Sequence, residues 1–406
     1  MIASPPPCIP TPRPTRRSPG LVSGLLLALC AAAAAAAPYK PQDDQQVLLR
    51  LPAGASSRSG PVAELQRQLA RNPRQPELAA QVARHHLQRL VAEGDPRFAG
   101  RAQAALAPWW ADPAPPPELR VARAVLRQFQ HEFDAALADL DAVVRQDPSH
   151  VQAWSWIAAI AMVQARYDRA RAACEAAAPH AQALLARSCA ATVDAATGQA
   201  RRAAAALQQA LKDAPDADPS LRLWVGTRLA ETHERLGDLP SAEAAYRQAL
   251  ALGLDDSYLL AAYADFLLDQ KRPAEVLALL KDRERNDLHL LRLALAGRAT
   301  AHPRAAAWQA DLAARFDAAR QRGDTAHQKE QARFALELLG DAARALPLAR
   351  ANYAVQREAA DARLLLQSAL AARQKSAAAP ALDWLRQSRF ESPALHALAA
   401  QVEALP

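Results

Sequence analysis

The chain has 406 residues, a formal net charge of +7, 13 glycines and 5% aromatic residues. Alanine, leucine and arginine dominate, and strand-type runs of valine, isoleucine and threonine are absent. This composition predicts an all-α protein and argues against a mainly β fold. The basic residues are spread along the chain without forming a cluster, so we expect no nucleic-acid binding.

The first 36 residues have the features of an export signal. Three arginines among the first 17 residues form a basic n-region, and residues 21–37 form an apolar h-region that ends in alanines. Cleavage is expected after Ala36, because Pro38 hinders cleavage directly before itself. We therefore expect a periplasmic or secreted protein whose mature chain has no transmembrane span.

Two alternatives remain open for this segment. One is an uncleaved membrane anchor, although the apolar stretch is short for a spanning helix. The other is a lipoprotein acylated at Cys30, which Leu29 disfavours because the residue before an acylated cysteine is normally small. Residues 37–59 are polar and are expected to form an extended arm.

A repeat with a period near 34 residues begins at Pro117. Its clearest part, residues 237–250, resembles the second helix of a tetratricopeptide repeat (TPR), which has Gly at position 15 and small residues at positions 8, 20 and 27. With Gly237 at position 15, the unit begins at Leu223 and puts alanine at all three small positions. The same template begins again at Pro117, Val151, Leu184 and Ser257, so successive starts are 34, 33, 39 and 34 residues apart.

The resemblance implies a right-handed superhelical solenoid of about eight antiparallel helix hairpins. Small residues let the two helices of a hairpin approach closely, and stacked hairpins bury the remaining apolar faces. TPR-like repeats are expected over residues 60–282, with the best matches at 117–282, and divergent helical repeats with a capping helix over 283–406. A domain boundary is best placed near 283–303.

The C-terminal run from Glu330 to Leu370 (EQARFALELLGDAARALPLARANYAVQREAADARLLLQSAL) resembles a segment of exported bacterial TPR proteins that have no assigned biochemical role. This resemblance supports the predicted fold and compartment and implies nothing about mechanism.

The TPR resemblance also implies a binding groove, because the first helix of each hairpin in that family lines the concave face through positions 2, 5, 9 and 12. The groove is expected to bind a protein or an extended peptide that has apolar anchors and some basic residues. It would be neutral on one side and acidic with two aromatics on the other. An alternative is that the two aromatics pack between repeats. The partner-binding residues expected from this register are Gln152, Ser155, Trp224, Thr227, Glu231, Glu234, Tyr258 and Asp265.

Cys174 and Cys189 are the two cysteines that remain after removal of the signal. Cys174 falls on the second helix of one unit and Cys189 on the first helix of the next, so their sulfurs can meet. An exported protein favours a structural disulfide between them, and two buried free thiols are the alternative. A redox-active pair is disfavoured because no C-x-x-C spacing occurs.

Motifs for chemistry are absent. The ten histidines show no metal-binding spacing, and no zinc-protease, nucleophile-elbow, phosphate-loop or calcium-loop pattern occurs. We expect no metal, no cofactor and no catalytic activity. The predicted function is an exported scaffold for protein–protein interaction in envelope or secretion-complex assembly. The alternatives are an accessory factor for glycan or cell wall, and an enzyme with an unrecognised site in the concave groove.

Overall fold

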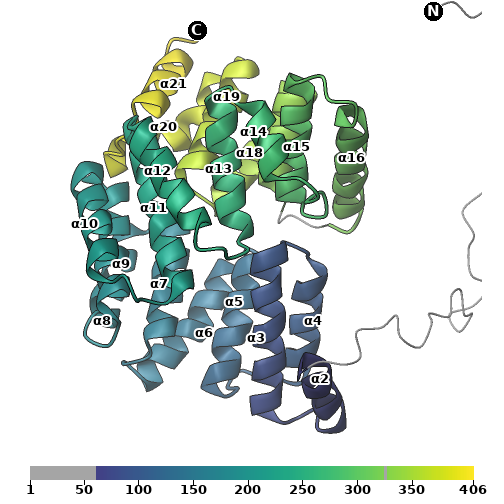
Figure 1. The fold of residues 1–406 in the computed structure, drawn as a ribbon, viewed down its shortest axis with the longest axis vertical. Coiled ribbons are helices and arrows are strands. Elements are labelled where there is room, and N and C mark those ends of the chain that lie inside the picture. Colours follow the sequence, from purple (N-terminus) through teal and green to yellow (C-terminus); the bar gives the residue numbers. More distant parts are fainter. Residues whose placement is uncertain (1–60, 324–326) are drawn as a thin grey trace, which may run out of the picture. The chain divides into compact units, whose positions relative to one another are not determined.

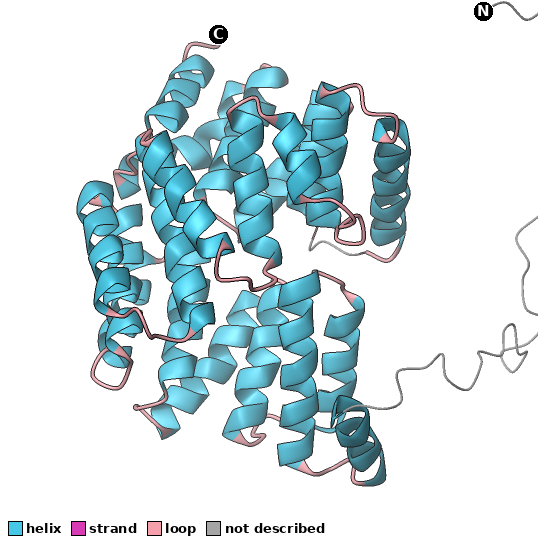
Figure 2. Ribbon diagram, in the orientation of Figure 1, coloured by secondary structure: helices cyan, strands magenta, loops and turns pink. Residues whose placement is uncertain are grey.

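A computed structural model describes residues 61–323 and 327–406, and all of the regular structure in these residues is helical (Figures 1 and 2). The predicted signal segment and arm at 1–59 lie outside the described residues. The α-helices are α2 (Pro61–Arg71), α3 (Pro76–Glu93), α4 (Arg97–Leu106), α5 (Pro117–Phe129), α6 (Phe133–Gln146), α7 (Val151–Val163), α8 (Tyr167–Ala177), α9 (Ala183–Ala196), α10 (Ala200–Asp213), α11 (Pro219–Leu236), α12 (Leu239–Leu250), α13 (Ser257–Asp269), α14 (Pro273–Leu279), α15 (Asp287–Ala299), α16 (Ala305–Gln321), α17 (Gln328–Arg333), α18 (Ala342–Val355), α19 (Ala359–Ala371), α20 (Ala379–Ser388) and α21 (Pro393–Glu403). Short 3-10 turns occur at η1 (Ala107–Trp109) and η3 (Lys375–Ala378), and a π-helical turn, η2 (Phe334–Leu338), extends α17.

Aspartates start several of these helices. Asp218 accepts hydrogen bonds from the backbone N–H groups of Ser220 and Leu221 at the start of α11. Asp238 and Asp256 cap α12 and α13 in the same way. A side-chain acceptor at this position satisfies backbone donors that have no partner within the helix, so these residues set where each helix begins.

Consecutive helices pack as pairs, and a residue with positive φ makes the turn within a pair. These residues are Gly94, His131, Ala165, Gly198, Gly237, Lys271, Ala301, Gly340 and Arg373. Five of them, from His131 to Lys271, stand at position 15 of the five units that the sequence predicts. The left-handed backbone costs a non-glycine residue about 1–2 kcal/mol, which explains why glycine is preferred there.

Small residues hold the helices of a pair close together. Ala230 on α11 and Ala242 on α12 are completely buried. Gly226 lies so near α12 that a Cβ atom added to it would be 3.3 Å from the Cβ of Ala249. The three alanines at the predicted small positions are thus buried, and Ala249 lies where the two helices of this pair approach closely.

The pairs also pack in series. The first helices of consecutive pairs contact one another in order, from α3 and α5 through to α19 and α21. We call α3, α5, α7, α9, α11, α13, α15, α17, α19 and α21 the first-helix row. Three apolar clusters follow each other along the chain, and one of them continues from Leu280 through Leu290 to Leu338. Packing therefore continues across residues 283–303.

Helices far apart in sequence also touch. The hydroxyl of Ser257 at the start of α13 donates to the backbone carbonyl of Ala92 on α3, at 2.7 Å. The indole N–H of Trp384 on α20 donates to the hydroxyl of Tyr167 on α8, at 2.8 Å. Figure 1 shows α3 below α13 and the C-terminal helices beside the middle of the chain. These contacts, which the repeat alone does not predict, join the described hairpins into one unit.

Candidate functional site

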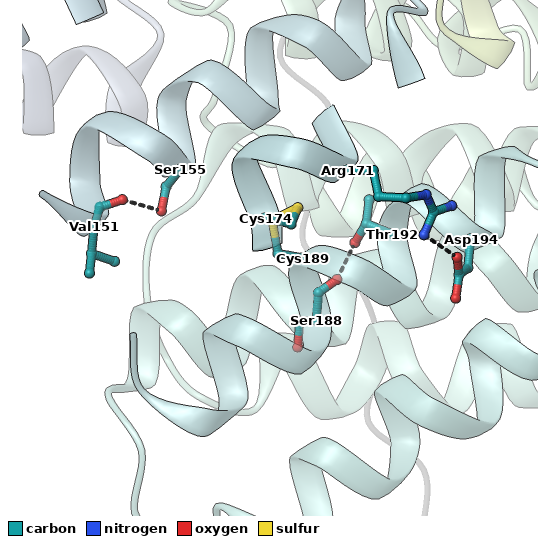
Figure 3. The surroundings of a disulfide bond; sticks show 8 residues. All are labelled: Val151, Ser155, Arg171, Cys174, Ser188, Cys189, Thr192 and Asp194. Carbon is teal, nitrogen blue, oxygen red and sulfur yellow. Dashed lines mark hydrogen bonds and ion pairs between the residues drawn. A yellow bond between two sulfur atoms is a disulfide. The ribbon is translucent and has the colours of Figure 1, made fainter. Parts of the chain in front are cut away.

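The structure places the two predicted groove residues of α7 differently. Gln152 is exposed and lines a cavity of about 550 Å³. Ser155 is half-buried, and its hydroxyl donates to the backbone carbonyl of Val151 at 2.9 Å (Figure 3). The hydroxyl of Ser155 is thus used within its own helix, whereas the side chain of Gln152 faces open space.

We call this space the N-terminal cavity. Four members of the first-helix row surround it, together with the loop before α13. Its lining residues are Ala80, Arg84, Leu87, Gln88, Val91 and Ala92 of α3, Glu118, Val121, Ala122 and Val125 of α5, His150, Gln152 and Trp156 at α7, Ser220 and Leu223 of α11, and Leu254, Asp255 and Asp256 of the loop. The lining is mainly apolar. The volume of the cavity suits a small ligand or a few side chains of a partner.

Trp224 and Thr227 on α11 contribute mainly to packing. Trp224 is half-buried against the apolar cluster that contains α11 and α13. Thr227 is 2% exposed and donates its hydroxyl to the carbonyl of Leu223 at 2.8 Å. The interpretation that aromatic groove residues pack between repeats therefore describes Trp224 better than Tyr258.

Glu231 on α11 and Tyr258 on α13, two of the predicted groove residues, contact each other. The Tyr258 hydroxyl donates to the Glu231 carboxylate at 2.6 Å. Arg228 forms an ion pair with Glu231 at 3.1 Å and stacks over the Tyr258 ring at 4.7 Å. Tyr258 remains 45% exposed, although burial by the surrounding helices raises its pKa well above the usual value. Its ring is therefore available for contact at a site with restricted solvation.

Glu234 turns toward α12. Its carboxylate accepts a 2.8 Å hydrogen bond from the hydroxyl of Tyr246, which is 1% exposed. Burial raises the pKa of Glu234 to about 7, and the neighbouring carboxylate of Glu231 adds to the rise, while the Tyr246 hydrogen bond partly opposes it. A partly buried carboxyl of this kind exchanges a proton near neutral pH.

Asp265 on α13 lies between two arginines, Arg292 on α15 and Arg333 on α17, and its oxygen is 3.0 Å from Arg333. Burial acts to raise the pKa of Asp265, but the two arginines outweigh it and hold the pKa at about 2. Asp265 is thus an ionised carboxylate whose charge is already compensated.

The C-terminal helices bring further cations to this part of the row. Arg363 on α19 donates to Asp269 on α13 at 2.8 Å, and Lys329 on α17 pairs with Asp361 on α19 at 2.9 Å. Of the acidic residues expected in the groove, Asp265 is therefore neutralised by cations that the groove register did not include. Glu231 pairs instead with Arg228 on its own helix, and Glu234 bonds to Tyr246. The spacing of the repeat does not reveal the pair of Arg363 with Asp269, because these residues are 94 positions apart and lie on hairpins that are not neighbours.

A second cavity, of about 610 Å³, lies where the start of α8 faces the end of α20. It is lined by Ala165, Arg166, Tyr167, Asp168, Arg169, Thr197, Gln387, Ser388 and Arg389. Its surface is polar, and Arg169 already pairs with Asp141 at 2.8 Å. This cavity contains none of the residues predicted from sequence.

The structure joins Cys174 on α8 to Cys189 on α9 in a disulfide, with their Cα atoms 5.6 Å apart (Figure 3). This is the predicted pairing. Cys174 is 3% exposed. The same two helices are linked by an ion pair between Arg171 and Asp194 at 2.9 Å. The disulfide thus ties the second helix of one pair to the first helix of the next.

Over 61–323 and 327–406, no group of three His, Cys, Asp or Glu side chains is arranged to hold a metal ion. In the same residues, no helix combines the length and the apolar character needed to cross a membrane.

Comparison with known proteins gives no identification. No family model matches the chain. No curated protein shows significant similarity to it.

Proposed function

We propose that the protein is an exported TPR-like scaffold that binds another protein along its first-helix row and assists assembly of an envelope or secretion complex. The observation that carries this proposal is the meeting of Glu231 and Tyr258, from neighbouring members of the row, at a half-exposed aromatic surface. Aromatic side chains with one polar end are common anchors of protein interfaces.

The arrangement of the helices supports a curved array. First helices contact each other along the whole row, whereas the second helices of successive pairs pack together much less. When the first helices of an array pack more closely than its second helices, the array curves and the first helices lie on the inner side. The first-helix row would then line the inside of a superhelix of eight or nine hairpins, and partners of solenoid proteins commonly bind on such a concave surface.

The compartment is supported by chemistry. The disulfide between Cys174 and Cys189 is stable in an oxidising compartment and is rare in the cytosol. It fits the export signal that the first 36 residues predict.

The test is an affinity pull-down from envelope extract with the chain that begins at Ala37. Wild type is compared with Tyr258→Ala and with Leu339→Ala, a matched control that removes a side chain of similar exposure outside the predicted groove (41% against 45%). We expect mass spectrometry to identify a protein that wild type and Leu339→Ala retain and Tyr258→Ala loses. Equal recovery by all three would place the binding surface elsewhere. Enrichment of glycan, or of no macromolecule, would argue against a protein scaffold.

A further inference from the structure

We propose that the N-terminal cavity is a side-chain pocket for a partner peptide, and that it takes one large apolar side chain flanked by a lysine or arginine that pairs with Glu118. The inference deepens the proposed function and rests on it, because it names the chemistry of the bound segment. It also places the anchor away from Glu231 and Tyr258, at the N-terminal end of the row.

The apolar part of the pocket is shown by unusual exposure. Val91 on α3 and Leu254 in the loop before α13 are 43% and 39% exposed, and both line the cavity. They are two of only five large apolar side chains with such exposure among the described residues. Trp156 on α7 is half-buried beside them. Water-exposed apolar groups gathered in a concave site indicate an apolar ligand group.

The charged residues that line the cavity, which we call its rim, indicate the charge of the ligand. Three carboxylates, of Glu118, Asp255 and Asp256, face the cavity together with one guanidinium, that of Arg84. The carboxylate of Asp255 pairs with Arg283 at 2.6 Å, and that of Asp256 caps α13 through the backbone N–H of Leu259.

Glu118 differs from these two aspartates. Its carboxylate is exposed and has no hydrogen bond or ion pair with any described residue. The guanidinium of Arg84 is likewise exposed and unpaired, but three carboxylates face the cavity against the guanidinium groups of Arg84 and Arg283. This negative excess favours a basic group on the partner, since complementary charges select between partners. The ligand is therefore assigned as a peptide with an apolar anchor and an adjacent basic residue.

The chain contains a matched control for Glu118. Pro117, Glu118 and Leu119 begin α5, and Pro76, Glu77 and Leu78 begin α3 with the same three residue types. Glu77 is also exposed but does not line the cavity. Reversal of either charge perturbs the first turn of a helix equally. Only Glu118→Lys changes the rim of the pocket.

The experiment is selection of a random heptapeptide phage library on the immobilised full-length protein, followed by fluorescence polarisation with the peptides recovered. We expect wild type and Glu77→Lys to recover sequences with a large apolar residue beside Lys or Arg. Glu118→Lys should weaken binding of those peptides by about tenfold and recover acidic flanks instead. Trp156→Ala should weaken binding by about tenfold or more, because it removes the aromatic wall.

Several results would overturn the proposal. Equal binding by Glu118→Lys and Glu77→Lys, or recovery of purely apolar sequences, removes the charge assignment. Recovery of no peptide removes the peptide assignment. A homodimer that dissociates in Trp156→Ala would assign the cavity to a second copy. The proposed function is tested separately: an envelope protein lost by Tyr258→Ala but retained by Trp156→Ala would leave the scaffold standing without this pocket.

Discussion

Removal of the disulfide between Cys174 and Cys189 should loosen α8 and α9 without unfolding the rest of the described chain. The perturbation is made in two ways, by reduction of the wild-type protein and by the double variant Cys174→Ala/Cys189→Ala. Reduction removes no atom from the two side chains and adds one hydrogen to each sulfur. Agreement between the two treatments would therefore assign the effect to the cross-link.

The magnitude follows from the length of the closed loop. The two cysteines are 15 residues apart, and a loop of that length gives about 3 kcal/mol of stabilisation in the chain-entropy model. This corresponds to a change of about 150-fold in the local opening equilibrium. Because each hairpin of a stacked array contacts mainly its neighbours, the loss should be greatest in α8 and α9 and smaller at α3 and α4.

The assay is amide hydrogen exchange resolved along the chain, combined with urea unfolding of oxidised protein, reduced protein and double variant. Faster exchange in α8 and α9 and a lower urea midpoint are expected after either treatment. The reasoning is refuted if oxidised and reduced protein show the same exchange rates in these helices and the same midpoint. A uniform increase in exchange over all helices would refute the claim that the effect is local.

Two further predictions concern a backbone position and a partly buried acid. Gly94→Ala should lower the stability of the protein in urea unfolding more than Gly237→Ala does. Both glycines have positive φ, but a Cβ atom added at Gly94 would lie 2.1 Å from the side-chain nitrogen of Asn286, whereas a Cβ added at Gly237 would have no atom within 4 Å. Equal midpoints for the two variants would contradict this. The pKa of Glu234 rises from 4.5 to about 7 on folding, so its contribution to stability is lost as pH rises from about 4.5 to 7. Glu234→Gln keeps an acceptor for Tyr246. The free energy of unfolding of this variant minus that of wild type should therefore be more positive at pH 8 than at pH 5. An equal difference at both pH values would argue against the raised pKa.

Sequence patterns predicted the local features of the fold well, because those features follow short-range rules. Position 15 of each unit needs a left-handed turn, and the structure has one at His131 and Ala165 although neither is glycine. The position of Cys174 on one helix and Cys189 on the next was enough to predict their pairing. The solenoid handedness and the TPR relationship remain predictions.

The site was harder to predict because it depends on contacts between distant hairpins. Asp265 was assigned to an acidic wall, but Arg333 lies 68 residues further along the chain and neutralises it. Trp156 and Val91 were not among the groove positions, since the family register counts only four places on each first helix. The N-terminal cavity exists because α3 and the loop before α13 approach each other, and no repeat pattern encodes that approach.

The contacts between distant helices bear on how the protein folds. Ser257 and Ala92 are 165 residues apart, and Trp384 and Tyr167 are 217 apart. An open array of repeats behaves as a one-dimensional chain that frays from its ends and can nucleate anywhere. Here each long-range contact closes a large loop, which raises the contact order and slows folding relative to an open array of the same length. The benefit falls at the ends: terminal hairpins that touch the middle of the chain must break those contacts to fray, so they should fray less readily than the ends of an open array.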